Sequence, residues 1–231
     1  MIDVRSEISK NADSKYREFH IGLVPGIGKC NGVPTPVLRK ISREVRKSDW
    51  RRFLSIPPEC YEETIVRALV IAGAKMDVSE RLRLTEEFMP EVTNWAVCDI
   101  FCGEWTAKGE EEREALWRCC LRQMGTGDEF RMRVSAVMML AHFIDGDHID
   151  AVLDVLSSAC HPGYYYKMGS AWAISVCFVK FPEKTEPVLF ADALDKEIRD
   201  KAIQKICDSR RVDKADKERL KLRKRRLDRP L

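Results

Sequence analysis

The sequence predicts an all-α protein built as an α-solenoid of antiparallel helix pairs, and three observations support this fold class. No segment alternates apolar β-branched residues with polar ones as a half-buried strand does. Apolar residues instead recur at spacings of three and four along the chain, which is typical of amphipathic helices. A pattern led by a basic residue also repeats after 34 residues. A globular helical bundle with coincidental spacing is the alternative.

Short helices are predicted, because capping and turn residues interrupt the apolar pattern repeatedly. Thr35 offers an N-cap that is followed by Pro36 at the first helical position. Four further side chains are predicted N-caps: Asp49, Ser79, Asp128 and Asp195. The expected helices cover residues 2–20, 36–47, 50–55, 58–76, 79–91, 94–106, 110–124, 128–144, 147–159, 163–180, 183–192, 195–208 and 213–226.

The repeat is marked by Arg133, Lys167 and Lys201, each of which opens the body of an expected helix and lies 34 residues from the next. Helix pairs that recur at this period stack into a solenoid, and one helix of each pair lies on the concave surface. We therefore expect the three cations to line a basic concave face. No Gly-, Ser- or Pro-rich linker interrupts the pattern, so we expect one domain over residues 1–231, with 210–231 as a basic C-terminal helix or tail.

Length and composition fit a folded protein in a reducing compartment. Of the 231 residues, 45% are hydrophobic and 33% charged. No apolar run approaches the ~20 residues of a membrane span, and the first residues contain no apolar export signal. The nine cysteines include no Cys-x-x-Cys pair, and we expect them to be reduced and mostly buried. A cytosolic protein without a membrane partner is predicted.

Positive charge is concentrated at the C-terminal end. Residues 210–231 contain eleven Lys and Arg against four Asp and Glu, so this segment carries +7 and residues 1–209 carry −4 of the net +3. A basic end of this kind fits a polyanionic partner. A fraying, solvated helix would have the same composition.

The most informative motif runs from Asn94 to Asp99, within a helix rich in Cys and Trp. Trp95 and Asp99 are four residues apart and therefore share one helix face. An aromatic face beside a fixed negative charge suits a cationic ligand or a developing positive charge. The alternative is a half-buried Trp with an exposed Asp one turn away, which any amphipathic helix can contain.

Three other groups of residues are weaker indications of a functional site. Cys160 and His161 are adjacent, which is poor geometry for two ligands of one zinc ion, so we expect no metal. The Gly-Ile-Gly-Lys segment at 26–29 follows no strand and lacks the spacing of a phosphate-binding loop. The cluster Tyr-Tyr-Tyr-Lys at 164–167 could pack on a nucleic-acid backbone or cover the core.

Several of these segments together resemble the AlkD-type DNA alkylation-repair proteins. The resemblance is carried by Val-Pro-Thr-Pro-Val-Leu-Arg at 33–39, Asn-Trp to Asp at 94–99, Arg-Met-Arg-Val at 131–134 and Ala-Trp-Ala at 171–173. It extends over most of residues 14–208, and the Trp-x-x-x-Asp helix is its most specific element. It implies a right-handed, C-shaped solenoid of HEAT-like repeats and a DNA glycosylase that removes cationic N3- or N7-alkylated purines without a cofactor.

The resemblance also assigns roles to residues. Trp95 and Asp99 match the catalytic pair, Trp172 matches a second aromatic wall, and Arg133 matches an Arg that grips the DNA backbone. The further predicted DNA contacts are Arg39, Lys167, Lys201, Arg210 and Arg211. The implied partner is duplex DNA containing alkylated purines, bound by a monomer.

Two departures from the family keep other functions open. About fourteen residues precede Lys15, fewer than in catalytic members, and the segment from Pro25 to Gly32 replaces a tighter connection. The alternatives are a catalytically inert HEAT-like protein that recognises damaged or branched DNA by shape, and a protein-binding HEAT scaffold. For the C-terminal end we predict a loosely attached basic helix from Asp213 to Leu227 that raises non-specific DNA affinity.

Overall fold

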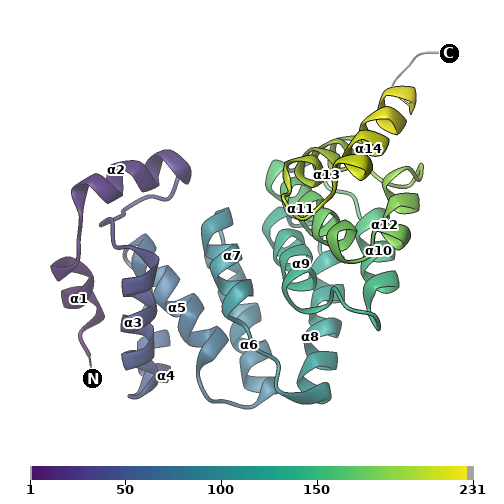
Figure 1. Ribbon diagram of the computed structural model, residues 1–231. Coiled ribbons are helices and arrows are strands. Elements are labelled where there is room, and N and C mark those ends of the chain that lie inside the picture. Colours follow the sequence, from purple (N-terminus) through teal and green to yellow (C-terminus); the bar gives the residue numbers. More distant parts are fainter. Residues whose placement is uncertain (1, 228–231) are drawn as a thin grey trace. The chain divides into compact units, whose positions relative to one another are not determined.

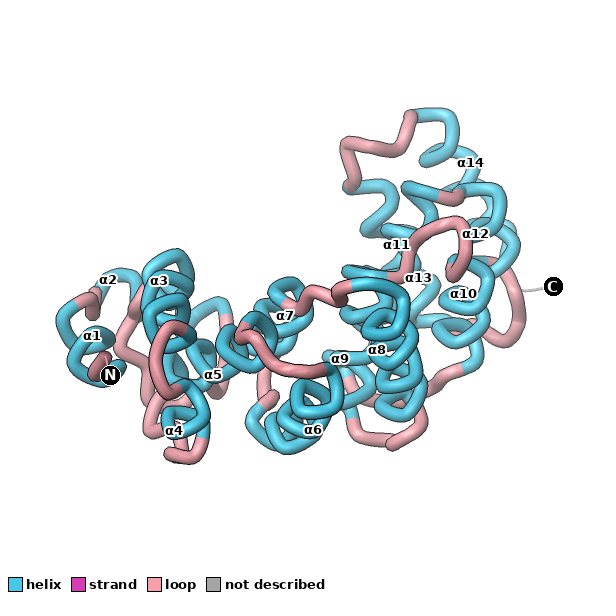
Figure 2. The backbone as a smooth tube through the Cα atoms, turned by 90° about the horizontal axis from the view of Figure 1, so that it is seen from below, coloured by secondary structure: helices cyan, strands magenta, loops and turns pink. Residues whose placement is uncertain are grey.

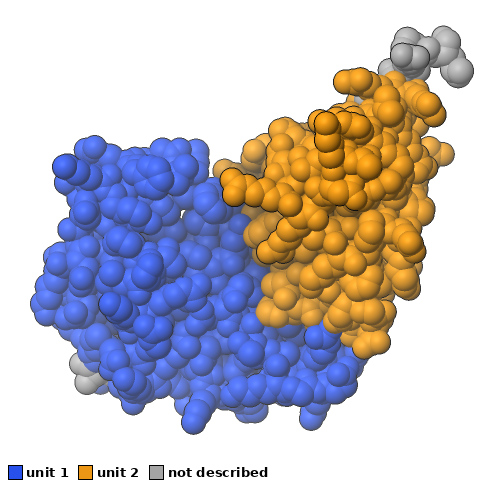
Figure 3. All heavy atoms as spheres, in the orientation of Figure 1, with its two compact units in different colours: residues 1–119 blue, residues 120–231 orange. Residues whose placement is uncertain are grey.

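The computed structural model describes residues 2–227, and within them it contains helices and no strand (Figures 1 and 2). The all-α class predicted from the sequence is therefore confirmed. The chain divides into two compact units, residues 1–119 and 120–231, which are coloured separately in Figure 3. The boundary falls inside helix α8 (Gly109–Met124). The handedness of the solenoid, its C shape, its basic concave face and the single domain stay predictions.

Unit 1 is organised around a helix that is buried on nearly every side. Its helices are α1 (Val4–Lys10), α2 (Ser14–Leu23), α3 (Thr35–Arg46), α4 (Trp50–Leu54), α5 (Tyr61–Gly73), α6 (Val78–Phe88), the 3-10 turn η1 (Met89–Glu91) and α7 (Trp95–Glu104). Between Ile65 and Gly73 the residues of α5 are apolar or glycine except Arg67, and nearly all are buried, so α3 packs on one side of the helix and α7 on the other. This stacking of alternate helices fixes α7, the helix that carries Trp95 and Asp99.

Unit 2 stacks its helices in the same alternating way. After the end of α8 come α9 (Glu129–His142), α10 (Ile149–Ser158), α11 (Tyr164–Lys180), α12 (Pro182–Leu189), α13 (Lys196–Asp208) and α14 (Lys214–Leu227). Helix α11 packs between α9 and α13, while α10 packs against α12. The three helices α9, α11 and α13 carry the cations spaced by 34 residues, so the sequence period corresponds to neighbouring helices of one layer.

The prediction of one helix over residues 2–20 is wrong. Two helices form there, because Asp13 caps a new start: its carboxylate accepts a hydrogen bond from the backbone N–H of Tyr16 at 2.9 Å. The predicted cap at Ser79 is also wrong, since Asp77 caps α6 instead. Thr35 makes no side-chain cap and is the first residue of α3. The remaining predicted N-caps, at Asp49, Asp128 and Asp195, are confirmed.

The C-terminal helix α14 is more firmly held than the sequence predicts. Leu220 is completely buried, and Arg219 and Arg223 form ion pairs with Glu186 on α12 at 2.8 and 3.1 Å. Arg223 also lies 4.1 Å above the ring of Phe190. Helix α14 is therefore docked on its neighbours in unit 2, and the expectation of a loosely attached segment is wrong.

Candidate functional site

The Trp95–Asp99 pair lies at the start of α7, whose first turn is fixed by a side-chain cap. Asn94 is 5% exposed, and its side-chain oxygen accepts a hydrogen bond from the N–H of Val97 at 3.0 Å. The residues that α7 buries (Ala96, Val97, Cys98, Phe101 and Cys102) are on its inner face. Trp95 and Asp99 are both half-buried and one turn apart, as their spacing predicts.

The indole of Trp95 is attached to α2. Its Nε1–H donates to the carbonyl oxygen of Leu23, the last residue of that helix, at 3.3 Å. Helix α2 buries only His20, whose ring lies 5.6 Å from that of Tyr16 and 5.0 Å from that of Tyr61 on α5. The sequence contains no signal for the contact between α2 and Trp95, because it depends on how the two helices meet.

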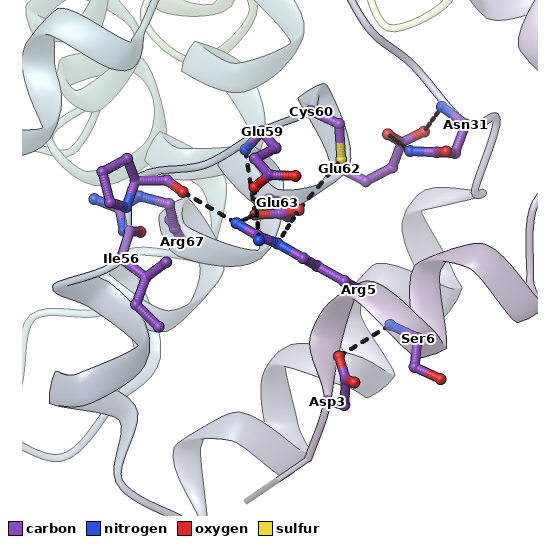
Figure 4. A network of polar contacts seen from close by, with 11 residues as sticks. Asp3, Arg5, Ser6, Asn31, Ile56, Glu59, Cys60, Glu62, Glu63 and Arg67 are labelled. Carbon is purple, nitrogen blue, oxygen red and sulfur yellow. Dashed lines mark hydrogen bonds and ion pairs between the residues drawn. The ribbon is translucent and has the colours of Figure 1, made fainter.

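A buried carboxylate, Glu62 on α5, orders the loop that follows α2. It accepts hydrogen bonds from the backbone N–H groups of Asn31 and Gly32 at 2.8 Å each and of Val33 at 3.3 Å, and from the Cys30 thiol at 3.3 Å. The Asn31 side chain donates a further one at 3.1 Å (Figure 4). Burial alone would raise the pKa of Glu62, but these hydrogen bonds outweigh it and lower the pKa. Glu62 is thus a positioning residue that sequence reasoning missed.

Gly32 is required in this loop for two reasons. Its φ is +81°, a conformation that L side chains rarely adopt, and a Cβ there would lie 2.7 Å from the Cβ of Arg17 on α2. The close approach holds the first turn of α2 against the loop. Nearby, Arg5 on α1 forms an ion pair with Glu63 on α5 at 3.1 Å and another with Glu59, which precedes that helix, at 2.7 Å (Figure 4).

Arg39, a predicted DNA contact, is used within unit 1. Its guanidinium pairs with Glu104 at the end of α7, and Arg46, also on α3, donates to the same carboxylate at 2.8 Å. Burial lowers the pKa of Arg46, and the neighbouring cations lower it further. The Arg39 side chain is 38% exposed, so part of it faces solvent. Its contact with DNA stays a prediction, and its observed contact ties α3 to α7.

In unit 2, two of the repeated cations connect one helix to the start of the next. Arg133 on α9 is 5% exposed and donates from Nη1 to the carbonyl oxygen of Tyr165 at 2.8 Å. Glu129, one turn earlier on α9, accepts from the N–H of Tyr165 and so caps α11, which has no side-chain cap of its own. Lys167 on α11 pairs with Glu197 in the first turn of α13 at 2.7 Å, and this hydrogen bond raises the pKa of Lys167.

The other predicted cations are placed differently. Lys201 is half-buried and Arg210 and Arg211 are exposed, and none of these three side chains forms an ion pair with another residue in the range 2–227. Trp172 on α11 is half-buried and lines a groove together with Arg211. Thus Arg39, Arg133 and Lys167 have partners inside the protein. Lys201, Arg210 and Arg211 have no ion-pair partner in the range 2–227.

Two further properties concern the part of the chain that the structure describes. Across residues 2–227 no three His, Cys, Asp or Glu side chains are grouped so that they could hold a metal ion. None of the helices in this range has the length and apolar character needed to cross a membrane.

A comparison with known protein families identifies the family of this chain. The family described as "DNA alkylation repair enzyme" matches residues 4–163, which is more than half of the sequence. A search of curated proteins gave no match. The matched stretch contains Arg39, Trp95, Asp99 and Arg133, and it ends before Lys167 and the residues that follow. The chain therefore belongs to the DNA alkylation repair enzyme family.

Proposed function

We propose that the protein is a monofunctional DNA glycosylase that hydrolyses the N-glycosidic bond of cationic N3- or N7-alkylated purines in duplex DNA. The observation that carries the proposal is the placement of Trp95 and Asp99 on one half-exposed face of a helix whose other face is buried. A carboxylate one helical turn from an aromatic residue suits a reaction in which positive charge develops on the substrate. The family match supports a role in alkylation repair.

The chemistry follows from the charge of the lesion. Alkylation at N3 or N7 makes the purine cationic, so it departs as a neutral base when the bond between C1′ and the ring nitrogen breaks. The deoxyribose acquires oxocarbenium character in the transition state, as in other glycoside hydrolyses. Asp99 would stabilise this cation and orient the water whose oxygen bonds to C1′, taking up the proton that the water loses. Trp95 and Trp172 would supply aromatic contacts to the sugar.

The cations are proposed to bind the phosphate backbone. Lys201, Arg210 and Arg211 are the candidates whose side chains have no ion pair among the described residues, and they would give affinity that is independent of sequence. Arg39, Arg133 and Lys167 remain proposed DNA contacts, each in addition to its observed contact within its own unit. No cofactor is needed for this reaction.

The decisive experiment is single-turnover base release from a duplex that contains one N7-methylguanine or N3-methyladenine. Asp99→Asn should reduce the rate by about 10²–10³-fold and leave duplex affinity within a few fold of wild type, because it removes the charge and keeps the shape. Asp154→Asn, at an exposed position on α10, is the control and should excise normally. Equal rates of base release for wild type and Asp99→Asn would show that Asp99 takes no part in the reaction.

An inert DNA-binding protein is the second candidate, since Lys201, Arg210 and Arg211 could bind a duplex without any chemistry. In that case the wild type would bind DNA with a steep salt dependence and release no base from either lesion. A protein scaffold would show no measurable affinity for the duplex. The same binding and release assays therefore separate all three functions.

A further inference from the structure

Helix α2, near the N-terminus (Figure 1), is attached to unit 1 by little packing. In the part of the chain that the structure describes, none of the helix pairs that pack extensively includes α2, and the helix buries only His20. Its large apolar side chains Phe19, Ile21 and Leu23 are exposed. A helix of 10 residues is marginally stable in water by itself, so α2 depends on its few attachments.

The His20 ring is the centre of this attachment. It is 9% exposed and lies between two tyrosine rings, with its centroid 5.6 Å from that of Tyr16 on α2 and 5.0 Å from that of Tyr61 on α5. The Tyr16 ring is nearly parallel to it, at an interplanar angle of 13°. Because Tyr61 is itself buried, these ring contacts join α2 to the core of unit 1.

One nitrogen of the His20 ring has no partner in the protein. Its Nε2 atom is buried and forms no hydrogen bond with another atom in residues 2–227. In a protonated imidazole both ring nitrogens carry a hydrogen. Protonation in place would therefore leave a charged N–H donor buried without an acceptor, which costs more than burying a neutral nitrogen.

The groups around the ring determine when it gains a proton. Burial lowers the pKa of His20 below its ordinary value of 6.5, and the opposing field of the Glu62 carboxylate on α5 is the smaller effect. The other titratable groups beside the rings are Tyr16, Tyr61 and the Cys30 thiol, which faces Tyr61 from the loop after α2. Burial raises the pKa of Tyr61 and that of Cys30, so both stay neutral at physiological pH. His20 is the member of this cluster that becomes charged in mild acid.

We propose that His20 is a positioning residue for Trp95, and that protonation of its imidazole detaches α2 from unit 1. While α2 is attached, the carbonyl oxygen of Leu23 accepts the hydrogen bond of the Trp95 indole at 3.3 Å. When α2 detaches, this acceptor moves away and the indole loses the restraint. The inference rests on the proposed function and deepens it, because it names a residue that controls the aromatic contact through a neighbouring helix.

The direction of the pH effect follows from the lowered pKa of His20. In the detached state the ring is exposed and its pKa returns to about 6.5, so the detached state binds the proton more tightly than the attached state does. The attachment is strongest above pH 6.5 and weakens as the pH falls from there through the pKa of the attached ring. The protein thus holds Trp95 in place at neutral pH and releases it in acid.

Hydrogen exchange of the backbone amides of α2 tests the proposal on the full-length protein without DNA. Protection factors, corrected for the intrinsic exchange rate at each pH, are compared at pH 7.5 and pH 5.5 by mass spectrometry. On acidification the protection of α2 in the wild type should fall at least about threefold, while that of α5 stays the same. His20→Phe keeps an aromatic ring between the two tyrosines and takes up no proton, so its α2 should be equally protected at both pH values.

His161→Asn is the matched control. It removes an imidazole from unit 2 and keeps an acceptor for the N–H of Gly163, which donates to His161 Nδ1 at 2.9 Å, so its α2 should respond to pH as in the wild type. The pKa of His20, measured by NMR in the wild type, should lie below 6.5 and needs no variant. The proposal is overturned if this pKa is 6.5 or higher, if α2 of the wild type is equally protected at both pH values, or if α2 of His20→Phe loses protection as the wild type does.

Base excision tests the effect on Trp95. Single-turnover release from a duplex with N7-methylguanine, corrected for release without enzyme, should slow in the wild type over the pH range in which α2 detaches, and His20→Phe should keep its rate to lower pH. If both proteins slow in parallel while α2 detaches only in the wild type, the positioning role is overturned. If no base is released at any pH, the proposed function fails and the positioning role with it, whereas hydrogen exchange still decides whether His20 attaches α2.

Discussion

The indole N–H of Trp95 donates to the carbonyl oxygen of Leu23 at 3.3 Å, which links the first residue of α7 to the last residue of α2. Because α2 buries only His20, this hydrogen bond is one of the few attachments of that helix within unit 1. The orientation of the proposed aromatic contact therefore depends on a helix with little packing of its own. Three exposed apolar side chains, Phe19, Ile21 and Leu23, belong to the same helix.

The contribution of this hydrogen bond can be separated from that of the ring. Trp95→Phe keeps an aromatic face and loses the N–H donor, so single-turnover excision should fall by no more than about tenfold, the value of one neutral hydrogen bond. Trp95→Ala removes the face as well and should cost considerably more. If both variants lost activity equally, the N–H group and its link to Leu23 would be the feature that matters.

Glu62→Gln should lower the free energy of unfolding at pH 7 by about 2–4 kcal/mol, as judged by urea denaturation. A neutral amide accepts weaker hydrogen bonds than a carboxylate, and its NH2 group would face the N–H donors of Asn31 and Gly32. Glu59→Gln is the control, because the Glu59 side chain is 56% exposed and its loss should cost less than about 1 kcal/mol. A cost for Glu62→Gln as small as that of the control would mean that the loop does not depend on the buried charge.

The same residue predicts how stability changes with acidity. The folded protein holds the pKa of Glu62 below its ordinary value of 4.5. A lowered pKa contributes stability above the unfolded value, and this contribution disappears as the pH falls through the folded value. Wild-type stability should thus decline when the pH drops below about 4.5, and Glu62→Gln should show a shallower decline over the same range. Parallel profiles for the two proteins would contradict this.

Arg133→Ala is expected to destabilise unit 2 by about 2–4 kcal/mol, since a charged hydrogen bond to Tyr165 and the packing of a buried side chain are both lost. Lys167→Ala should cost less, about 0.5–1 kcal/mol, because its partner Glu197 is 52% exposed. The salt dependence of duplex binding, measured at a temperature where both variants are folded, tests the proposed DNA contacts. Each residue that touches a phosphate should make the slope shallower by about one unit when it is replaced.

We expect the two faces of α14 to have different roles, one stabilising the fold and the other binding DNA through its charge. Leu220→Ala removes a completely buried side chain and should destabilise the protein by about 2–4 kcal/mol. Lys221→Gln/Arg225→Gln changes two exposed residues and should weaken duplex binding at low salt, while the single-turnover rate at saturating enzyme stays the same. A loss of that rate in the charge variant would mean that α14 takes part in more than non-specific binding.

Local sequence patterns predicted the helices and the faces that their residues share. They could not predict the contacts between helices. Helix spacing placed Trp95 and Asp99 correctly on one face, because that relation needs only a helical backbone. The 34-residue period identified neighbouring helices, yet it could not reveal that Arg133 turns toward the backbone of α11. Glu62 gave no signal, since a buried acid in a helix looks in sequence like an exposed one until the loop that it binds is in place.

The docking of α14 also has a consequence for proteolysis. Trypsin cleaves after Lys and Arg, which make up much of this helix, but a protease needs an extended backbone and so cuts only when the helix opens. Because Leu220 and the ion pairs of Glu186 must separate before α14 can unwind, the rate of tryptic nicking there measures the free energy of detachment from α12. Tryptic cleavage of this basic helix therefore measures how firmly the helix is docked on α12.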